Sequence, residues 1–248
     1  MTEQEIIGKG TWIDKLAYEV IKNEKEHPSI DGVIKVESGL GASGIPHIGS
    51  LGDAVRAYGV KLALENLGYK SELIAYSDDM DGLRKIPEGF PESLNEYLGK
   101  RVSKIPDQNP RGCHDSYGEH MSSLLLEGLD ELDIKYVHKT AHETYKNGLL
   151  QEQIHKILSN WEKVGDIIKE LTDQTKFQEV YPYAAVCAGC GKIYTTKATD
   201  YLQDERRIVY KCETTTIGYK TPLEGCGHEG EADITKDDGK LAWKVEFA

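Results

Sequence analysis

A glycine-rich segment that ends in a histidine is the part of this sequence best suited to chemistry. Residues 37–50 read Glu-Ser-Gly-Leu-Gly-Ala-Ser-Gly-Ile-Pro-His-Ile-Gly-Ser, between a strand-like run at 32–36 and a helical pattern at 51–67. A loop between a strand and a helix start presents free backbone N–H groups and the positive end of the helix dipole, and both favour a bound phosphate. His47 would add an imidazole N–H donor at that helix start. The segment therefore predicts a phosphate-binding site.

Three interpretations of this segment compete. Gly39, Gly41 and Gly44 match the dinucleotide fingerprint G-x-G-x-x-G, but 45–47 separates the last glycine from the helix. The acidic residue that would hold a ribose is expected about 20 residues on, and the first acids after the next strand-like run begin only at Asp78. A tight turn without a ligand is the second interpretation. The third, which we favour, is nucleotidyl transfer.

Nucleotidyl transfer suits these residue types. When a carboxylate attacks the α-phosphate of ATP, charge develops on the phosphoryl oxygens, and hydrogen-bond donors and Mg²⁺ stabilise it. A histidine at a helix start can donate to such an oxygen without moving a proton. Gly49 would let the nucleotide approach the backbone, and Gly39 and Gly41 would let a substrate lie over the loop.

Four of the five cysteines have the spacing of a metal site. Cys187 and Cys190 enclose a tight Ala-Gly turn, and Cys212 and Cys226, separated by thirteen residues, would supply the other pair. An odd number of cysteines without an export signal favours metal over disulfides. We predict a structural zinc site, because four thiolates leave no open coordination position. His228 is the alternative to Cys226, and a small β domain with free thiols is the alternative to the metal.

Apolar periodicity predicts the elements that position these residues. Helices are expected at 12–25, 51–67 and about 115–132, and strands at 32–36, 72–76 and 135–138. The order strand, helix, strand, loop, helix, strand is that of the first half of a doubly wound parallel sheet, so we predict an α/β fold.

The pattern changes after this half-sheet. Residues 142–171 are expected to be helical, 180–232 to form a small β domain, and 242–247 to start a returning strand. We expect three domains: a Rossmann-like catalytic half-domain, a helical connective segment, and a zinc-binding insertion with the start of the returning strand, at 1–140, 141–179 and 180–248.

Three motifs resemble those of class I aminoacyl-tRNA synthetases, and most of all the N-terminal half of the archaeal-type class I lysyl-tRNA synthetases. They are the 37–50 segment with its His-Ile-Gly signature, Asp78–Pro87 after the second predicted strand, and Gly112–His120 at the head of the next helix. The resemblance implies ATP-dependent formation of lysyl-adenylate, followed by attack of the terminal 2′-hydroxyl of tRNA(Lys). Its implied ligands are ATP, Mg²⁺, lysine and structural Zn²⁺.

The resemblance also implies roles for residues. The catalytic positions are His47, Gly49 and Ser50. The same three join Ser43 and Gly44 around ATP. The amino-acid side is implied to comprise Gly39, Gly41, Asp78, Asp79, Asp81 and Arg84.

One of the three aspartates would pair with the substrate ammonium, since a buried charge pair rejects uncharged side chains. A helix cap or an ion pair with Arg84 is the alternative for these residues. His114 and His120 are either a structural pair around Tyr117 or substrate contacts, and Cys113 is expected to be an unliganded thiol.

The chain departs from the family pattern at several points. Ser50 stands where Asn or His is usual, and Gly41 where Thr is common. The Lys-Met-Ser-Lys-Ser signature and the helical anticodon-binding region are absent from the sequence. We therefore expect the chain alone to aminoacylate poorly, and its first strand to offer a bare edge to the missing C-terminal half or to another chain. A non-catalytic RNA- or nucleotide-binding paralogue and a nucleotidyltransferase with another acceptor are the alternatives.

Charge and hydropathy set the remaining limits. The net charge of −12 argues against nucleic-acid binding by the protein as a whole. A late group of basic residues is either a local RNA contact or a solvated surface, and comprises Lys192, Lys197, Arg206, Arg207, Lys211 and Lys220. Without an apolar run of about 20 residues and with a polar N-terminus, we expect a cytoplasmic protein that does not enter membranes.

Overall fold

The computed structural model describes residues 10–109, 112–217 and 221–246. Lys220, one of the predicted basic residues, lies outside this part of the chain. The chain divides into two compact units, the first made of residues 1–78 and 121–140 and the second of residues 79–120 and 141–248. The division falls within the acidic motif, between Asp78 and Asp79.

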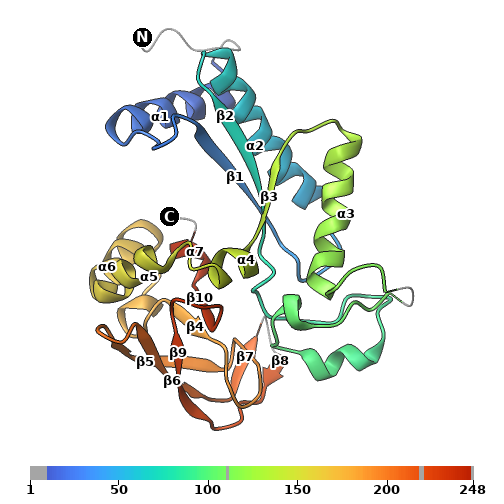
Figure 1. Ribbon diagram of the computed structural model, residues 1–248, viewed down its shortest axis with the longest axis vertical. Helices are drawn as coiled ribbons and strands as arrows, with labels where there is room; N and C mark the ends of the chain where they lie inside the picture. The colour runs from blue at the N-terminus through green and yellow to red at the C-terminus, as the bar shows by residue number, and fades with distance from the viewer. Residues whose placement is uncertain (1–9, 110–111, 218–220, 247–248) are drawn as a thin grey trace. The chain divides into compact units, whose positions relative to one another are not determined.

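The first unit contains a parallel three-stranded sheet in the order β1-β2-β3 (Figure 1). Its strands are β1 (Ile34–Leu40), β2 (Ser71–Ser77) and β3 (Val137–Thr140). Its helices are α1 (Trp12–Glu26), α2 (Ile48–Asn66) and the greater part of α3 (Tyr117–Glu131). The predicted α/β half-sheet is confirmed. In the described residues β1 pairs with β2 alone, so it lies at an edge of the sheet.

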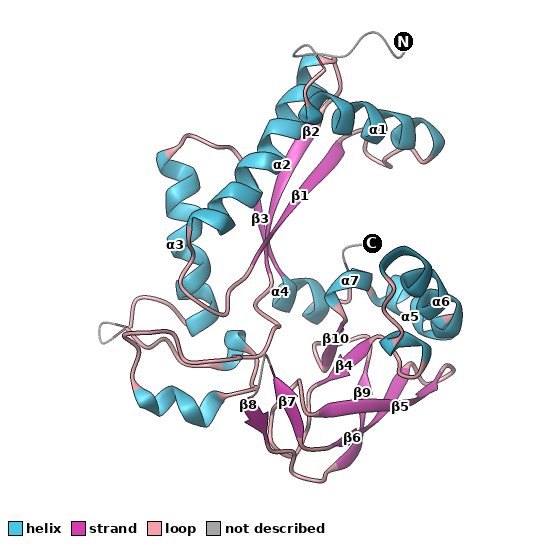
Figure 2. Ribbon diagram, turned by 180° about the vertical axis from the view of Figure 1, so that it is seen from behind, coloured by secondary structure: helices cyan, strands magenta, loops and turns pink. Residues whose placement is uncertain are grey.

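Burial follows this arrangement. The central strand β2 is buried from Leu73 to Ser77, because it has a neighbour on both sides and helices on the sheet. Helix α2 lies along the strands in Figure 2, and Ala54 and Leu73 pack together with Leu129 in the core beneath it.

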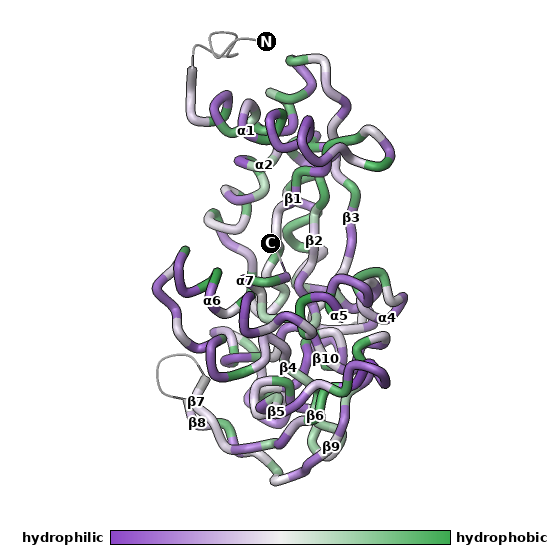
Figure 3. Tube along the Cα trace, turned by 90° about the vertical axis from the view of Figure 1, so that its left-hand side faces the viewer, coloured by the Kyte–Doolittle hydropathy of each residue, from purple (hydrophilic) through white to green (hydrophobic). Residues whose placement is uncertain are grey.

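Helix α1 is amphipathic. It begins with a capping box in which Thr11 and Asp14 satisfy each other's backbone N–H groups. Ala17 and Ile21 are buried against Val60 and Leu64 of α2. Figure 3 shows hydrophobic and hydrophilic stretches alternating along α1. The sequence periodicity therefore corresponds to a real buried face.

The first strand lies later in the chain than predicted. It was expected at 32–36, but β1 runs from Ile34 to Leu40, so Glu37 and Gly39 of the predicted loop are strand residues. The reason is tertiary: Gly39 is a poor strand former alone, but it pairs with Tyr76 of the buried strand β2. The loop proper is 41–47, and α2 begins at Ile48.

The second unit combines short helices with small antiparallel sheets. The predicted helical region separates into α4 (Ala141–Lys146), α5 (Gln151–Ser159) and α6 (Trp161–Thr172). Gly148, at φ +64°, lies between the first two, and Asn160 between the last two. Three short 3₁₀ helices occur at Glu92–Tyr97, Val102–Lys104 and Lys176–Gln178.

The predicted β domain is present. The strands are β4 (Tyr183–Ala185), β5 (Thr196–Leu202), β6 (Arg207–Cys212), β7 (Thr215–Ile217), β8 (Thr221–Leu223), β9 (Glu229–Asp233) and β10 (Gly239–Leu241). They form antiparallel sheets of order β5-β6-β9, β10-β4 and β7-β8. The predicted zinc-site cysteines lie in and between these strands.

The predicted returning strand at 242–247 is wrong. Trp243–Glu246 forms the short helix α7 (residue 247 lies outside the described part of the chain). The helical turn lets Val245 pack against Ile168 and Phe177, while the Glu246 side chain is buried beside Lys240. These contacts within the second unit decide the conformation.

None of the helices in the described residues is both long and apolar enough to cross a membrane.

Candidate functional site

His47 is the N-cap residue of α2. Its backbone is extended, at φ −138° and ψ 178°, and its Nδ1 atom accepts a hydrogen bond from the Gly49 N–H at 3.0 Å. In a neutral imidazole an accepting Nδ1 places the proton on Nε2. Because the His47 side chain is exposed, this geometry offers an Nε2–H donor at the start of a helix.

Gly49 makes room for the His47 ring. A Cβ atom at position 49 would lie 2.8 Å from the imidazole Cε1 and 2.9 Å from Nδ1. A side chain there would displace the ring. Sequence reasoning gave this glycine a role toward the nucleotide but missed its contact with the neighbouring histidine.

The other residues predicted around ATP share this loop–helix junction. Ser43 and Gly44 lie in the 41–47 loop, and Ser50 lies in the first turn of α2. Gly41 and Gly44 have open space where a Cβ would stand. The first unit therefore brings five predicted positions to one junction at the carboxyl end of β1.

A polar pair that sequence reasoning missed lies between Ser77, at the end of β2, and His138 of β3. The buried Ser77 Oγ lies 2.9 Å from His138 Nε2. On β1, burial raises the pKa of the Glu37 carboxyl, against the opposing charge of Lys139. The parallel order of the strands could have indicated this pair, because parallel strands bring their carboxyl ends to one edge of the sheet.

The acidic motif is engaged in structural contacts. In the second unit, Asp79 Oδ1 accepts the His142 N–H at 2.7 Å, in the first turn of α4. Asp81 pairs with Arg84 through one oxygen and lies 3.3 Å from the Lys240 Nζ through the other. The helix cap and the ion pair with Arg84, foreseen as alternatives to substrate binding, are both present.

The four predicted zinc ligands lie together in the second unit. The Sγ atoms of Cys187, Cys190, Cys212 and Cys226 are all within 4.8 Å of one another. Four thiols at this spacing fit a tetrahedral zinc ion. His228 is outside this group, and its ring lies 6.2 Å from that of Tyr210. The arrangement favours Cys226 as the fourth ligand.

The surroundings favour ionised sulfur at Cys212, whereas burial raises the pKa of Cys187 and of Cys190. Burial opposes ionisation of Cys212, but its hydrogen bonds with the Thr195 hydroxyl and the Cys226 N–H prevail and lower its pKa to about 7. Gly189 leaves the space the knuckle needs, because a Cβ there would stand 3.1 Å from the Cys226 Sγ.

A second group of metal-ligand type was not foreseen. Ligand atoms of Asp107, Cys113, His114 and His120 all lie within 4.8 Å of one another. The Cys113 Sγ is 3.1 Å from His114 Nδ1, and Asp107 Oδ1 is 3.0 Å from His120 Nδ1. Cys113, which was expected to be an unliganded thiol, therefore lies among side chains that could ligate a metal ion. The sequence pattern that could have indicated this group is Cys-His followed six residues later by His, with an aspartate upstream.

Asp107 is held in its charged form. Burial acts against ionisation, but the backbone N–H groups of Asn109 and His114 and the His120 ring lower the pKa of its carboxyl to about 2. An ionised carboxylate beside a thiol and two imidazoles is a donor set that zinc accepts.

Three of the late basic residues form ion pairs with glutamates, and the Lys192 Nζ donates to the Glu224 carbonyl oxygen. Arg206 pairs with Glu152 at 2.6 Å, and Arg207 with Glu231 at 3.0 Å. Lys211 lies 3.5 Å from Glu229. These contacts support the interpretation of the group as a solvated surface.

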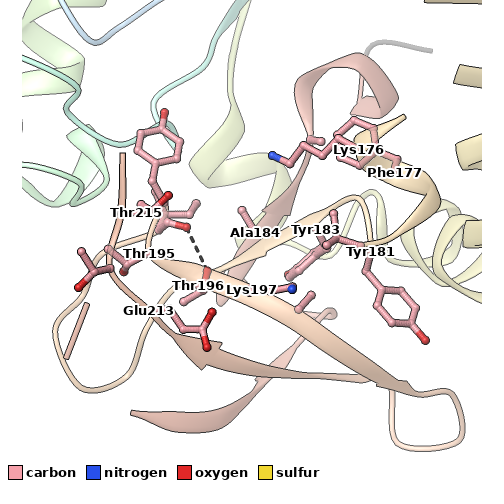
Figure 4. A pocket seen from close by; sticks show the side chains of 16 residues that line it. Lys176, Phe177, Tyr181, Tyr183, Ala184, Thr195, Thr196, Lys197, Glu213 and Thr215 are labelled. Atoms are coloured by element: carbon pink, nitrogen blue, oxygen red, sulfur yellow. Dashed lines mark hydrogen bonds between the residues drawn. The ribbon is translucent and has the colours of Figure 1, made fainter. Parts of the chain in front are cut away.

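A pocket of about 310 Å³ lies in the second unit. Figure 4 shows Phe177, Tyr181 and Tyr183 on it, together with Lys176 and Lys197. The residues predicted to bind ATP, lysine or zinc do not line this pocket.

Comparison with known proteins places this chain in a class. A family model described as "tRNA synthetases class I (K)" matches residues 10–248. The protein therefore belongs to the class I tRNA synthetases, enzymes that use ATP and Mg²⁺. Within that class it is a member of the (K) family.

Archaeal proteins named lysine–tRNA ligase are similar to it. One from Cenarchaeum symbiosum (strain A) is 60% identical over 99% of this chain and 46% of its own length. One from Methanosphaera stadtmanae is 33% identical over 96% of this chain and 41% of its own length. One from Archaeoglobus fulgidus is 32% identical over 96% of this chain and 43% of its own length. The chain spans about half the length of the curated relatives it matches.

Proposed function

We propose that this chain carries the adenylate-forming site of a lysine–tRNA ligase. The observation that carries the proposal is the exposed His47 at the N-cap of α2, whose Nδ1 is occupied by the Gly49 N–H so that Nε2 carries the proton. Such a donor, beside a helix N-terminus, matches the needs of a phosphoryl group under attack.

The reaction joins the carboxylate of lysine to the α-phosphorus of ATP, and pyrophosphate leaves with the electron pair of the broken P–O bond. The His47 Nε2–H donates to the phosphoryl oxygens as their charge grows. Ser43, Gly44, Gly49 and Ser50 line the nucleotide side. Mg²⁺ supplies countercharge for the phosphates when it is bound with ATP.

The residues assigned to the amino-acid side are Gly39, Gly41, Asp78, Asp79, Asp81 and Arg84. An aspartate of this motif holds the lysine ε-ammonium. A carboxylate in that place favours lysine over uncharged side chains, because it accepts a charge-assisted hydrogen bond from the ammonium.

Zinc at Cys187, Cys190, Cys212 and Cys226 has a structural role in this proposal, since a four-thiolate site has no open position. The Asp107, Cys113, His114 and His120 group forms a second metal centre, supported by the short distances among its donors. Both centres stabilise the second unit.

The partners and domains follow from the same function. The lysyl group passes to tRNA(Lys), so the site of action is the cytoplasm. The bare edge of β1 receives a strand of the C-terminal half or of another chain. The catalytic half-domain, helical segment and zinc-bearing insertion are assigned to 1–140, 141–179 and 180–248.

Calorimetry with a non-hydrolysable lysyl-adenylate analogue tests this proposal directly. The 248-residue chain should bind the analogue, and the variant His47→Ala should bind it at least about tenfold more weakly, since a hydrogen bond to a charged group contributes about 1.5–3 kcal/mol. The matched control is His27→Ala, just after α1. Binding that does not depend on the lysyl group, or equal affinity in the His47 variant, contradicts the proposal.

The same protein samples can test one alternative function. A non-catalytic RNA-binding paralogue would bind tRNA without binding the analogue. Lysine-dependent exchange of pyrophosphate into ATP, measured with and without added C-terminal half of a relative, separates the two possibilities.

A further inference from the structure

The segment that follows Asp79 is enclosed by residues from the zinc-bearing part of the second unit. Gly82 donates its N–H to the Tyr194 hydroxyl at 3.1 Å. The Arg84 Nε donates to the same hydroxyl at 3.1 Å, and the guanidinium carbon lies 5.4 Å from the centre of the Tyr194 ring. One tyrosine therefore fixes both a backbone and a side chain of the motif.

The fit around Gly82 is close. A Cβ there would lie 2.7 Å from a Tyr194 ring carbon, 2.9 Å from the Gly99 carbonyl oxygen and 3.0 Å from Ile193. The Leu83 N–H donates to the Lys100 carbonyl, and Ile193 N–H donates to Gly99 O, each within 2.9 Å. The motif, the 99–100 segment and the residues after the zinc knuckle thus form one hydrogen-bonded layer.

Ion pairs hold the Asp81 side chain of the motif. Lys240 of β10 is only 3% exposed, and its Nζ lies 3.3 Å from Asp81 Oδ1 and 2.9 Å from Glu246 Oε2. The other Asp81 oxygen pairs with Arg84. Two cations therefore balance two carboxylates. Removing one partner of a buried pair leaves an uncompensated charge, so Lys240 holds Asp81 in place.

We propose that Tyr194 and Lys240 are positioning residues, which hold Asp81, Gly82 and Arg84 in one conformation and thereby set the affinity of the lysine site. This inference rests on the proposed function, because it takes Asp81 and Arg84 as part of that site. Neither Tyr194 nor Lys240 is required to touch the substrate.

Tyr194→Phe tests the hydroxyl and keeps the ring beside Arg84. Hydrogen exchange at the Gly82 amide should become at least tenfold faster, and affinity for the lysyl-adenylate analogue should fall about tenfold. The matched control is Tyr201→Phe on β5, whose hydroxyl lies 2.6 Å from His155 Nδ1. The control should leave Gly82 exchange, analogue affinity and bound zinc unchanged.

A second variant keeps the test independent of misfolding. Lys240→Met combined with Glu246→Gln removes one charge of each sign and leaves the pair of Asp81 and Arg84 neutral. Exchange across residues 81–84 should again accelerate at least tenfold. Lys236→Met, which removes an exposed ammonium that pairs with Asp233, should not change it.

The outcomes separate the two proposals. Unchanged exchange at Gly82 in both variants overturns the positioning inference. Faster exchange with unchanged analogue affinity overturns its second half, and removes Asp81 and Arg84 from the lysine site. If the parent chain binds no analogue, the proposed function fails. Faster hydrogen exchange in the variants would still show that Tyr194 and Lys240 keep the motif in one conformation.

Discussion

The Gly49 N–H donates to the imidazole of His47 two residues before it, and position 49 has no room for a Cβ beneath that ring. The two residues act together: the glycine lets the imidazole lie over the first turn of α2, and its N–H holds the ring in the tautomer with a proton on Nε2. His47 and Gly49 of the His-Ile-Gly motif therefore form one geometric unit, in which Gly49 orients the His47 ring.

Gly49→Ala should separate function from stability. The added methyl group displaces the His47 ring, so affinity for the lysyl-adenylate analogue should fall about tenfold or more, the value of a lost hydrogen bond to a charged group. Alanine is favoured over glycine inside helices by about 1 kcal/mol, so the urea midpoint should stay the same or rise. Gly52→Ala is the control, because its Cβ would meet no atom within 4 Å. Equal affinity in the two variants would refute the link between Gly49 and His47.

Asp79→Asn should distinguish a helix cap from a substrate contact. The asparagine keeps an oxygen that can accept the His142 N–H, so the free energy of unfolding should change by less than about 1 kcal/mol. Affinity for the analogue should fall about tenfold, since the charge for the ammonium is lost. Asp53→Asn, an exposed position on α2, should change neither quantity. An unchanged affinity in the Asp79 variant would leave this residue as a cap alone.

Metal content should reflect both clusters. The purified chain should contain two zinc equivalents by elemental analysis. Cys187→Ser should lose one of them and Cys113→Ser the other, because each removes a ligand from a different group. The first variant should also melt at a lower temperature, since binding of a structural metal contributes to folding free energy. A zinc content that is the same in Cys113→Ser as in the parent would exclude the second centre.

Alkaline pH should weaken the fold through Tyr117. Burial raises the pKa of its phenol from 10.0 to about 12. Because the folded pKa lies above the unfolded one, the stabilisation is fully present below pH 10 and is lost as the pH rises toward 12. At pH 11 the loss is about 1 kcal/mol. The drop in unfolding free energy between pH 8 and pH 11 should therefore be smaller in Tyr117→Phe. Equal drops would show that this phenol does not contribute.

Local features of the sequence were enough for much of this structure. The periodicity of α1 and α2, the alternation of strands and helices, and the His-Ile-Gly motif are set by neighbouring residues. The loop–helix junction around His47 therefore follows directly from the chain. The grouping of four cysteines was predicted as well, because the short spacing of Cys187 and Cys190 presets half of a metal site and Cys212 and Cys226 supply a second pair of thiols.

Contacts between residues far apart in the chain decided the rest. β1 extends to Gly39 because β2 pairs with it, and Trp243–Glu246 is helical because Val245 packs on Ile168 and Phe177. The enclosure of Asp81 by Lys240 joins positions 159 residues apart. Periodicity and spacing report only on near neighbours along the chain, whereas burial and charge balance depend on which distant segments pack together. The sequence by itself thus determined the kinds of groups available and the local turn that presents His47, and the tertiary structure alone decided which partners hold the acidic motif.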